Sequence, residues 1–279
     1  MKKYLSLLAI PSLALALGAC GSDEDNTNDT GSTTEDKTIV IGASNGLHEL
    51  ILKEAAPILE EEGIELDIKP YQDYIMPNQD LDSGDLDANY FQHIPYLELE
   101  IADKGYDFVN AGGIHIEPIG IYSQKYKSLD ELPDGATIII SNSVSDQGRI
   151  LQLLEAEGLI KLADGIDKTA AELKDIVENP KNLNIDASSA PEMLVQYYEN
   201  GEGDAVVINS NFAIDAGINP IKDSIAIEGS ESPYVNVIAV RSEDEDSEAI
   251  KKLVEVLRSE PIQEFILEEW GGAVVPVSE

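Results

Sequence analysis

Short β-branched runs alternate with amphipathic stretches along most of the chain. The first run, residues 38–42, ends in glycine, and residues 47–62 then carry apolar side chains at helical spacing. Runs of the same two kinds predict further strands at 64–69, 136–140, 183–186, 205–208 and 235–240, and further helices at 148–157, 191–200, 211–216, 246–258 and 261–270. The alternation predicts an α/β protein whose parallel sheets are flanked by helices.

The length of this patterned region predicts two lobes. Roughly 240 residues follow position 36, which is more than a single hydrophobic core usually supports. We expect lobe 1 to comprise residues 37–122 plus 231–279 and lobe 2 to comprise residues 123–230, each an open sheet flanked by helices. Two chain crossings would then act as hinges. A ligand would bind between the lobes, at the carboxyl ends of the strands.

The first 20 residues have the features of a secretion and lipidation signal. Lys2 and Lys3 precede an apolar stretch, residues 5–17, that is shorter than the ~20 residues a membrane-spanning helix needs. The stretch ends at Leu17-Gly18-Ala19-Cys20, which resembles the bacterial lipobox, in which the cysteine is acylated and becomes the new N-terminus. Cys20 is the only cysteine of the chain, so we expect it to carry the lipid that anchors the protein on the extracytoplasmic face of the cell membrane.

Residues 21–36 contain no apolar side chain, and we expect them to form a disordered acidic tether. The whole chain holds 54 acidic residues against 18 basic ones, a formal net charge of −36. This balance excludes nucleic acid as an expected partner, because phosphate binding requires basic patches. The acidic excess is spread along the chain, which is typical of a solvated surface.

The segment Gly42–Gly46 matches the G-x-S-x-G pattern of a nucleophile elbow and lies between a predicted strand and a predicted helix. A serine hydrolase would use Ser44 with one of the three histidines, His48, His93 or His115. In α/β-hydrolases, however, the elbow follows several strands, whereas here it ends the first. We therefore favour a tight glycine turn, with no enzymatic activity and no cofactor, and keep the hydrolase as an alternative.

The same histidines allow a second alternative, a lipoprotein that binds zinc or manganese for an ABC importer. Histidine nitrogens and carboxylates are common ligands of such ions. His48, His93 and His115 are separated by 45 and 22 residues, and the sequence contains no H-x-H pair and no histidine-rich loop. Because no dense ligand cluster results, we expect no metal site, and metal import remains the alternative.

A segment rich in aromatic side chains, residues 71–96, is a candidate ligand wall. Aromatic residues make up 6% of the chain, yet this window holds five of them besides a histidine. Phe91, His93 and Tyr96 alternate with polar neighbours beside Pro95, which predicts a loop or a helix start rather than a buried stripe. Aromatic rings with polar tips suit a small apolar ligand group, including a thioether.

Arginine is scarce in this acidic chain. Arg149 follows Gly148 at the expected start of a helix, where a guanidinium and a helix N-terminus together favour a carboxylate. A chain with a net charge of −36 needs such a local positive charge to bind the carboxylate of an amino acid. The alternative is a surface arginine that pairs with one of the many acidic residues.

Ordered blocks across the mature chain resemble the NlpA family, the methionine-binding lipoproteins of ABC importers. The most specific blocks are Phe91-Gln92-His93 with Pro95-Tyr96-Leu97, and Ser232-Pro233-Tyr234-Val235-Asn236. Further matches lie at Asp73–Asn78, Gly84–Asn89, Tyr122–Ser123 with Lys127–Leu129, Gly158–Leu162, Val177–Leu183 and Gly271–Val274. The resemblance implies a periplasmic-binding-protein-like (type 2) fold, a monomer whose two α/β lobes close on an amino acid, with methionine as the best candidate, and deliver it to an ABC transporter permease.

The resemblance also implies a set of ligand-binding residues: Tyr74, Phe91, His93, Tyr96, Arg149, Asn209 and Asn236. The aromatic members and His93 would surround the ligand side chain, and Arg149 would bind its carboxylate. The two asparagines would hold the α-amino and carboxylate ends, since an amide both accepts and donates hydrogen bonds. At its position before Ser210, Asn209 could also cap a helix.

One loop departs from the family pattern. The family usually has two prolines in the loop before its Gly-Arg pair, whereas residues 141–147 contain none. We expect this loop to be less rigid and differently shaped. Methionine, D-methionine, a methionine-containing dipeptide and other amino acids therefore stay open as ligands.

Overall fold

The computed structural model describes residues 37–229 and 231–277. The predicted lipidation site Cys20 and the predicted tether, residues 21–36, lie outside the described residues. Among the helices that are described, none combines the length and the apolar character needed to span a bilayer. The described chain forms two larger sheets and one small two-stranded sheet.

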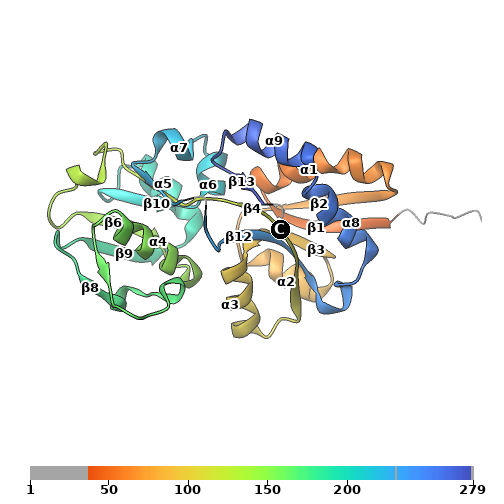
Figure 1. Cartoon of the computed structure of the whole chain (residues 1–279), viewed down its shortest axis with the longest axis horizontal. Coiled ribbons are helices and arrows are strands. Elements are labelled where there is room, and N and C mark those ends of the chain that lie inside the picture. Colours follow the sequence, from red (N-terminus) through yellow and green to blue (C-terminus); the bar gives the residue numbers. More distant parts are fainter. Residues whose placement is uncertain (1–36, 230, 278–279) are drawn as a thin grey trace, which may run out of the picture. The chain divides into compact units, whose positions relative to one another are not determined.

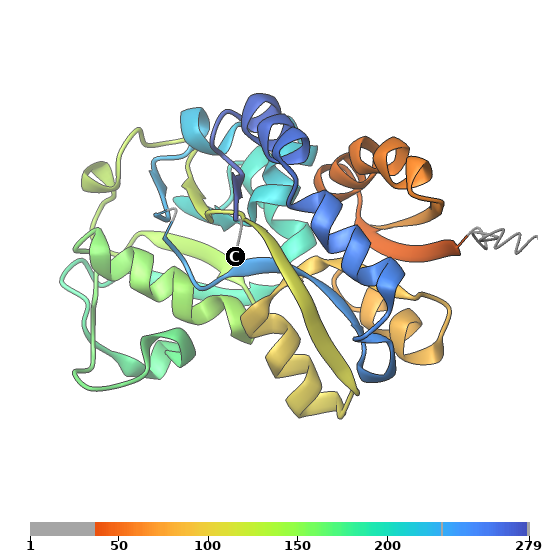
Figure 2. The same cartoon turned by 45° about the vertical axis from the view of Figure 1, so that its right-hand side comes forward.

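The first sheet has six strands in the order β13-β4-β12-β3-β1-β2. Strand β1 pairs in parallel with β2 and β3, while β12 runs antiparallel to both β3 and β4. Figure 2 shows β4 and β12 side by side along this sheet. The strands are β1 (Lys37–Ser44), β2 (Ile64–Tyr71), β3 (Ala88–His93), β4 (Phe108–Ile116), β12 (Val235–Arg241) and β13 (Val275–Pro276).

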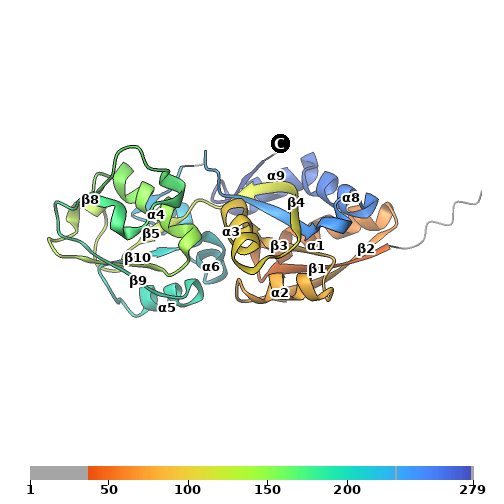
Figure 3. The same cartoon turned by 90° about the horizontal axis from the view of Figure 1, so that it is seen from below.

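Helices cover both faces of the first sheet (Figures 1 and 3). One face packs against α1 (Leu47–Glu61), α8 (Glu248–Leu257) and α9 (Glu260–Trp270), and the other against α2 (Met76–Ser83) and α3 (Ile94–Lys104). The apolar residues of α1 recur at helical spacing, and Leu47, Ile51 and Leu59 are fully buried. Each such side chain stabilises the fold by about 1.5–3 kcal/mol through burial.

The second sheet has five strands in the order β11-β5-β10-β6-β9. Its central strand pair, β10 and β6, is parallel, and β5 runs antiparallel to β10. The strands are β5 (Gly120–Tyr122), β6 (Thr137–Ser141), β9 (Asn184–Ser189), β10 (Ala205–Ile208) and β11 (Ala226–Ile227). The small antiparallel sheet joins β7 (Lys161–Leu162) to β8 (Ile176–Glu178).

Alternate residues of β6 and β10 serve two separate cores of the second sheet. Ile138 and Ile140 pack with α4 (Val144–Ala156), whereas Ile139 faces the opposite side with α5 (Leu194–Glu199) and α6 (Ser210–Asp215). Figure 3 shows these helices on the two faces. The remaining helix is α7 (Pro220–Asp223), and single 3-10 turns lie at Leu129–Glu131, Lys168–Ala170, Leu173–Asp175, Pro191–Met193 and Ser242–Asp244.

The chain passes from the first sheet to the second over residues 117–119, and residues 228–229 and 231–234 belong to the return. The sequence-based lobe boundary after residue 122 would separate β5 from β10, with which β5 pairs. This pairing moves the first crossing to the segment before β5. The predicted class, an α/β protein with open sheets flanked by helices, is confirmed.

Two local predictions were wrong. The helix expected from residue 148 begins at Val144. Gly148 lies inside this helix and does not mark its start. A glycine is needed there because a Cβ would meet the carbonyl oxygen of Thr169 at 2.1 Å. The loop or helix start expected around Phe91–Tyr96 was wrong for residues 91–93, which end the fully buried strand β3, whereas α3 does begin at Ile94. The polar members of β3 are buried because Gln92 donates hydrogen bonds to the side chains of Asn78 and Asn89, at 2.8 and 2.9 Å.

Candidate ligand-binding site

One cavity, partly open to solvent, is lined by all the residues that the sequence predicts to bind ligand. Its walls come from β3, α3, β12 and the first chain crossing on one side and from α4 and α6 on the other. The cavity is lined by Tyr74, Phe91, Gln92, His93, Tyr96, Glu117, Asp146, Arg149, Asn209, Ser210, Asn211 and Asn236.

Aromatic rings form one wall of the cavity. The Tyr74 ring lies 6.1 Å from that of Phe91 and 6.3 Å from that of Tyr96, and Phe212 extends the cluster at 5.1 Å from Tyr74. The polar tips are satisfied, since the Tyr96 hydroxyl donates to the Tyr74 carbonyl and the Tyr74 hydroxyl donates to Asn211 Oδ1. Burial raises the pKa of the Tyr74 hydroxyl, which keeps it neutral. The wall therefore offers uncharged ring faces to a small apolar group.

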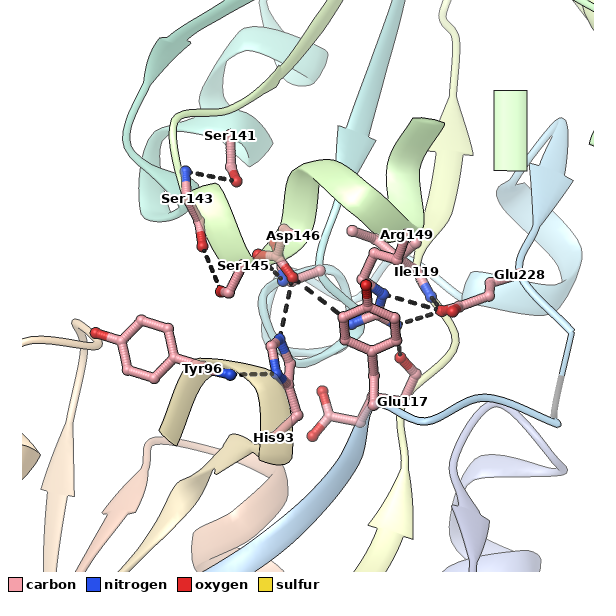
Figure 4. Close-up of polar contacts among 12 residues, drawn as sticks. His93, Tyr96, Glu117, Ile119, Ser141, Ser143, Ser145, Asp146, Arg149 and Glu228 are labelled. Atoms are coloured by element: carbon pink, nitrogen blue, oxygen red, sulfur yellow. Dashed lines mark hydrogen bonds and ion pairs between the residues drawn. The ribbon is translucent and has the colours of Figure 1, made fainter. Parts of the chain in front are cut away.

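His93 lies at the N-cap of α3 and has its tautomer fixed by its two neighbours. Its Nδ1 accepts from the backbone N–H of Tyr96 at 3.1 Å, so the proton is on Nε2, which donates to Asp146 Oδ1 at 3.1 Å (Figure 4). The other oxygen of Asp146 accepts from Asn209 Nδ2 at 3.2 Å. Burial alone would raise the pKa of Asp146, but His93, Arg149 and Asn209 together lower it. Asp146 is therefore a buried carboxylate anion at the edge of the cavity.

Arg149 lies in the second turn of α4 and is 4% exposed, so it is neither at the helix start nor on the surface. Its Nη2 donates to the carbonyl oxygen of Glu117 at 2.7 Å, and its Nε and Nη2 both contact the carboxylate of Glu228 (Figure 4). Nη1 lies 3.7 Å from Asp146 Oδ1. Burial lowers the pKa of the guanidinium, but Glu228 and Asp146 raise it overall, which keeps the group charged. The expected contribution of a helix N-terminus is absent here, because five residues of α4 precede Arg149.

The two predicted asparagines present opposite amide atoms to hydrogen-bond partners. Asn209 occupies the N-cap position of α6, but its side chain makes no capping bond and donates to Asp146 instead. Its Oδ1 is buried and has no hydrogen-bond partner among the described residues. In Asn236 it is Oδ1 that is occupied, at 3.2 Å from His48 Nε2. Asn209 thus offers an acceptor to the cavity, and Asn236 has its nitrogen left to donate.

Five lining residues were not predicted from the sequence: Gln92, Glu117, Asp146, Ser210 and Asn211. Glu117 is 7% exposed, and its carboxylate accepts from His115 Nε2 at 2.9 Å. A signal was available: Glu117 follows His115 by two positions at the end of β4, and residues two apart on a strand point to the same side. Asn211 and Ser210 carried no such signal, because the exact start of α6 decides where they point.

The geometry bears on the two alternative functions, metal binding and serine hydrolysis. Ligand atoms of His48, His115 and Glu117 lie within 4.8 Å of one another, the one group of this kind in the described chain, while His93 lies apart and bonds Asp146. Both Nε2 atoms are at hydrogen-bond distance from Glu117 Oε1, which is the arrangement of N–H donors around an acceptor. Ser44 Oγ is buried without a hydrogen-bond partner among residues 37–229 and 231–277, so it lacks the adjacent base that an activated nucleophile requires.

Two open α/β sheets joined by two chain crossings, with a polar and aromatic cavity between them, define a two-lobed solute-binding fold. The family model of the NlpA lipoproteins matches residues 39–278, and the chain belongs to this family. The resemblance found in the sequence is therefore confirmed.

Relatives in sequence include the methionine-binding lipoprotein MetQ of Bacillus subtilis, 49% identical over the full length of both chains. The D-methionine-binding lipoprotein MetQ of Escherichia coli K12 is 38% identical over 98% of both. Among solved structures, a putative methionine-binding lipoprotein of Bacillus subtilis has a TM-score of 0.85 at 53% identity and covers 87% of this chain and 99% of its own. A nutrient-binding protein of Burkholderia cenocepacia bound to methionine has a TM-score of 0.81 at 41% identity and covers 85% of this chain and 99% of its own.

Proposed function

We propose that this chain is the extracytoplasmic solute-binding lipoprotein of an ABC importer and that it binds an amino acid, with methionine as the best candidate. The carrying observation is that one cavity brings together a buried guanidinium, two oppositely oriented amides and an aromatic wall. The names of the MetQ relatives and the methionine-bound neighbour support the choice of ligand. They favour an amino acid over a metal ion as the transported solute.

Each part of an amino acid has a complementary partner in this proposal. The ligand carboxylate accepts hydrogen bonds from Arg149 Nη1 and from the amide nitrogen of Asn236. Arg149 Nη1 can donate to the ligand because it lies 3.7 Å from Asp146 Oδ1, which is longer than a hydrogen bond. The unpartnered Oδ1 of Asn209 accepts from the α-ammonium group. The thioether lies against Tyr74, Phe91 and Tyr96, where sulfur–aromatic contacts are favourable. His93 supports the aromatic wall through its hydrogen bonds with the backbone N–H of Tyr96 and with the carboxylate of Asp146.

We further propose that lobe 1 and lobe 2 close on the ligand about the two chain crossings, and that the protein performs no catalysis. A lipid on Cys20 would hold it, as a monomer, on the extracytoplasmic face of the cell membrane near its permease. Closure would present one surface to the permease only when ligand is bound. Such hinged closure is the usual behaviour of two-lobed binding proteins.

Isothermal titration of the purified protein tests the proposal. Co-purified ligand is first removed by unfolding and refolding, and the protein is then titrated with methionine, the other amino acids and methionine-containing dipeptides. We expect tight binding of methionine or a close relative. Failure of every amino acid and dipeptide would contradict the proposal, and a solute lost to a chelator would favour metal import.

A further inference from the structure

Glu117 is a buried carboxylate that faces the cavity and is surrounded by nitrogen donors. Its Oε1 lies 3.1 Å from His48 Nε2 and 2.9 Å from His115 Nε2, and its Oε2 accepts from the backbone N–H of Asn211 at 3.1 Å. The donors come from both sides of the cavity, because the histidines belong to α1 and β4 and Asn211 to α6. No predicted ligand-binding residue occupies this position.

Both histidines around Glu117 place Nε2 at hydrogen-bond distance from its carboxylate. His48 Nε2 faces two acceptors, Glu117 Oε1 and Asn236 Oδ1, so it carries the proton. Burial lowers the pKa of His48 to about 4, although Glu117 opposes this shift, so the ring is uncharged at neutral pH. His115 donates from Nε2 to Glu117, and its Nδ1 accepts from the Tyr90 hydroxyl.

Among the described residues, no lysine or arginine forms an ion pair with the Glu117 carboxylate, whose partners are His48 and His115. Burial raises its pKa, but the two histidines, the His115 hydrogen bond and Arg149 lower it to about 2, so the group is ionised. Arg149, the cation nearest to it in the cavity wall, bonds the backbone carbonyl of Glu117 and the carboxylate of Glu228 rather than the Glu117 carboxylate. A buried anion without a lysine or arginine partner is costly unless another cation joins it.

We propose that Glu117 binds the α-ammonium group of the ligand and that His48 and His115 are positioning residues that hold its carboxylate toward the cavity. This inference rests on the proposed function and identifies the group that is recognised, a primary ammonium. Asn209 Oδ1, buried and unpartnered among the described residues, supplies a second acceptor. The site thereby selects a zwitterionic amino acid over a simple carboxylic acid of the same shape.

His48 also links the two polar ends of the ligand. Its Nε2 lies within 3.2 Å of Asn236 Oδ1 and within 3.1 Å of Glu117 Oε1. The bond to Asn236 turns the amide so that its nitrogen is directed to the ligand carboxylate, while the bond to Glu117 fixes the acceptor of the ammonium. One uncharged imidazole behind the cavity therefore sets the direction of both ligand contacts.

Three ligands and one isosteric variant test the role of Glu117. Titrations use methionine, its deaminated analogue, which keeps the carboxylate and the thioether, and its decarboxylated analogue, which keeps the ammonium. Glu117→Gln should weaken binding of methionine and of the amine about ten- to a hundred-fold, the range of a charge-assisted hydrogen bond. Binding of the deaminated analogue should change little. Glu49→Gln removes an acidic group of α1 that does not line the cavity and should leave all three affinities as they were.

A substitution pair at His48 separates positioning from simple loss of structure. His48→Leu removes the donor and should weaken methionine binding, whereas the amide nitrogen of His48→Gln can donate again and should restore most of it. The deaminated analogue should respond less than methionine to His48→Leu. Equal losses for both ligands, or no rescue by glutamine, would show that His48 acts only on stability and would overturn its assignment.

The outcomes distinguish this inference from the proposed function. If the unsubstituted protein binds no amino acid, the proposed function fails first. If methionine binds but Glu117→Gln keeps its affinity within about two-fold, only the role of Glu117 fails. Tight binding of zinc ions that disappears in His48→Leu would instead assign the His48, His115 and Glu117 group to a metal and overturn the inference.

Discussion

The guanidinium of Arg149 lies 4.6 Å from the ring centroid of Tyr234, over the face of the ring. Both residues are buried, and they come from different parts of the chain, since Arg149 belongs to α4 and Tyr234 precedes β12. A cation over an aromatic face is attracted by the negative charge of the ring face. The ring therefore helps to hold the arginine beside the cavity.

Arg149→Ala and Arg149→Lys should both weaken methionine binding. Alanine removes the charge partner of a buried ligand carboxylate, at a cost of about 3–5 kcal/mol. Lysine keeps the charge but loses the planar fork and the stacking on Tyr234, so it should recover only part of the affinity. Calorimetry with methionine and with its decarboxylated analogue is the measurement. If the amine loses as much affinity as methionine does, Arg149 does not bind the carboxylate.

Glu228→Gln should destabilise the protein as well as weaken binding. The Glu228 carboxylate accepts from the backbone N–H of Ile119 at 3.1 Å and from Ser232 Oγ at 2.9 Å, besides contacting Arg149. It thus ties together the two chain crossings and the proposed carboxylate anchor. Loss of the charge should lower the free energy of unfolding by about 1–3 kcal/mol, measured by chemical denaturation. The exposed Glu231 lies on the same crossing, and Glu231→Gln should change stability by less than about 0.5 kcal/mol.

Much of the sheet framework could be predicted from the sequence, because strands buried on two faces carry continuous β-branched runs. The runs at 136–140 and 205–208 coincide with β6 and β10 for this reason. Strand β4 could not be found in this way, since it contains Gly112 and Gly113. A Cβ at these positions would meet side-chain atoms of Val254 and Val235 at 2.5 and 2.7 Å, so glycine is required by packing that only the folded chain reveals.

The residues of the candidate site could also be predicted only in part. The side chains grouped by family resemblance do line one cavity, but Glu117 was overlooked because a single carboxylate in a chain with 54 acidic residues carries no signal of its own. Its significance comes from His48 and His115, which lie 69 and 2 positions away in the sequence. The sequence pattern predicts Arg149 at a helix start, because the glycine at position 148 is typical of a helix boundary. The close approach of the Thr169 carbonyl gives that glycine another role.

Gly148→Ala should therefore destabilise the protein, against the usual trend for helices. In an exposed helix interior, alanine is more favourable than glycine by about 1 kcal/mol. Here the new Cβ would meet the Thr169 carbonyl oxygen at 2.1 Å and its carbon at 2.6 Å, so the backbone must move. We expect a loss of about 1–3 kcal/mol in the free energy of unfolding. At Gly229 a Cβ would meet nothing within 4 Å, and Gly229→Ala is the matched control. An increase in stability for Gly148→Ala would contradict the packing argument.

The stability of the protein should fall as the pH is lowered from 7 toward 4, and His48 should account for a large part of the change. Burial lowers the pKa of His48 from 6.5 to about 4 in the folded chain. Between these two values the unfolded chain binds a proton that the folded chain does not, so the free energy of unfolding decreases as the pH falls through this window. A difference of this size corresponds to about 3 kcal/mol.

Glu117 acts in a lower pH window, because its pKa is lowered from 4.5 to about 2 and its contribution to stability is lost only as the pH falls below 4.5. Denaturation of His48→Gln should show a shallower pH dependence between 6.5 and 4, and an unaltered slope in this window would contradict the assignment of His48 as a buried neutral donor.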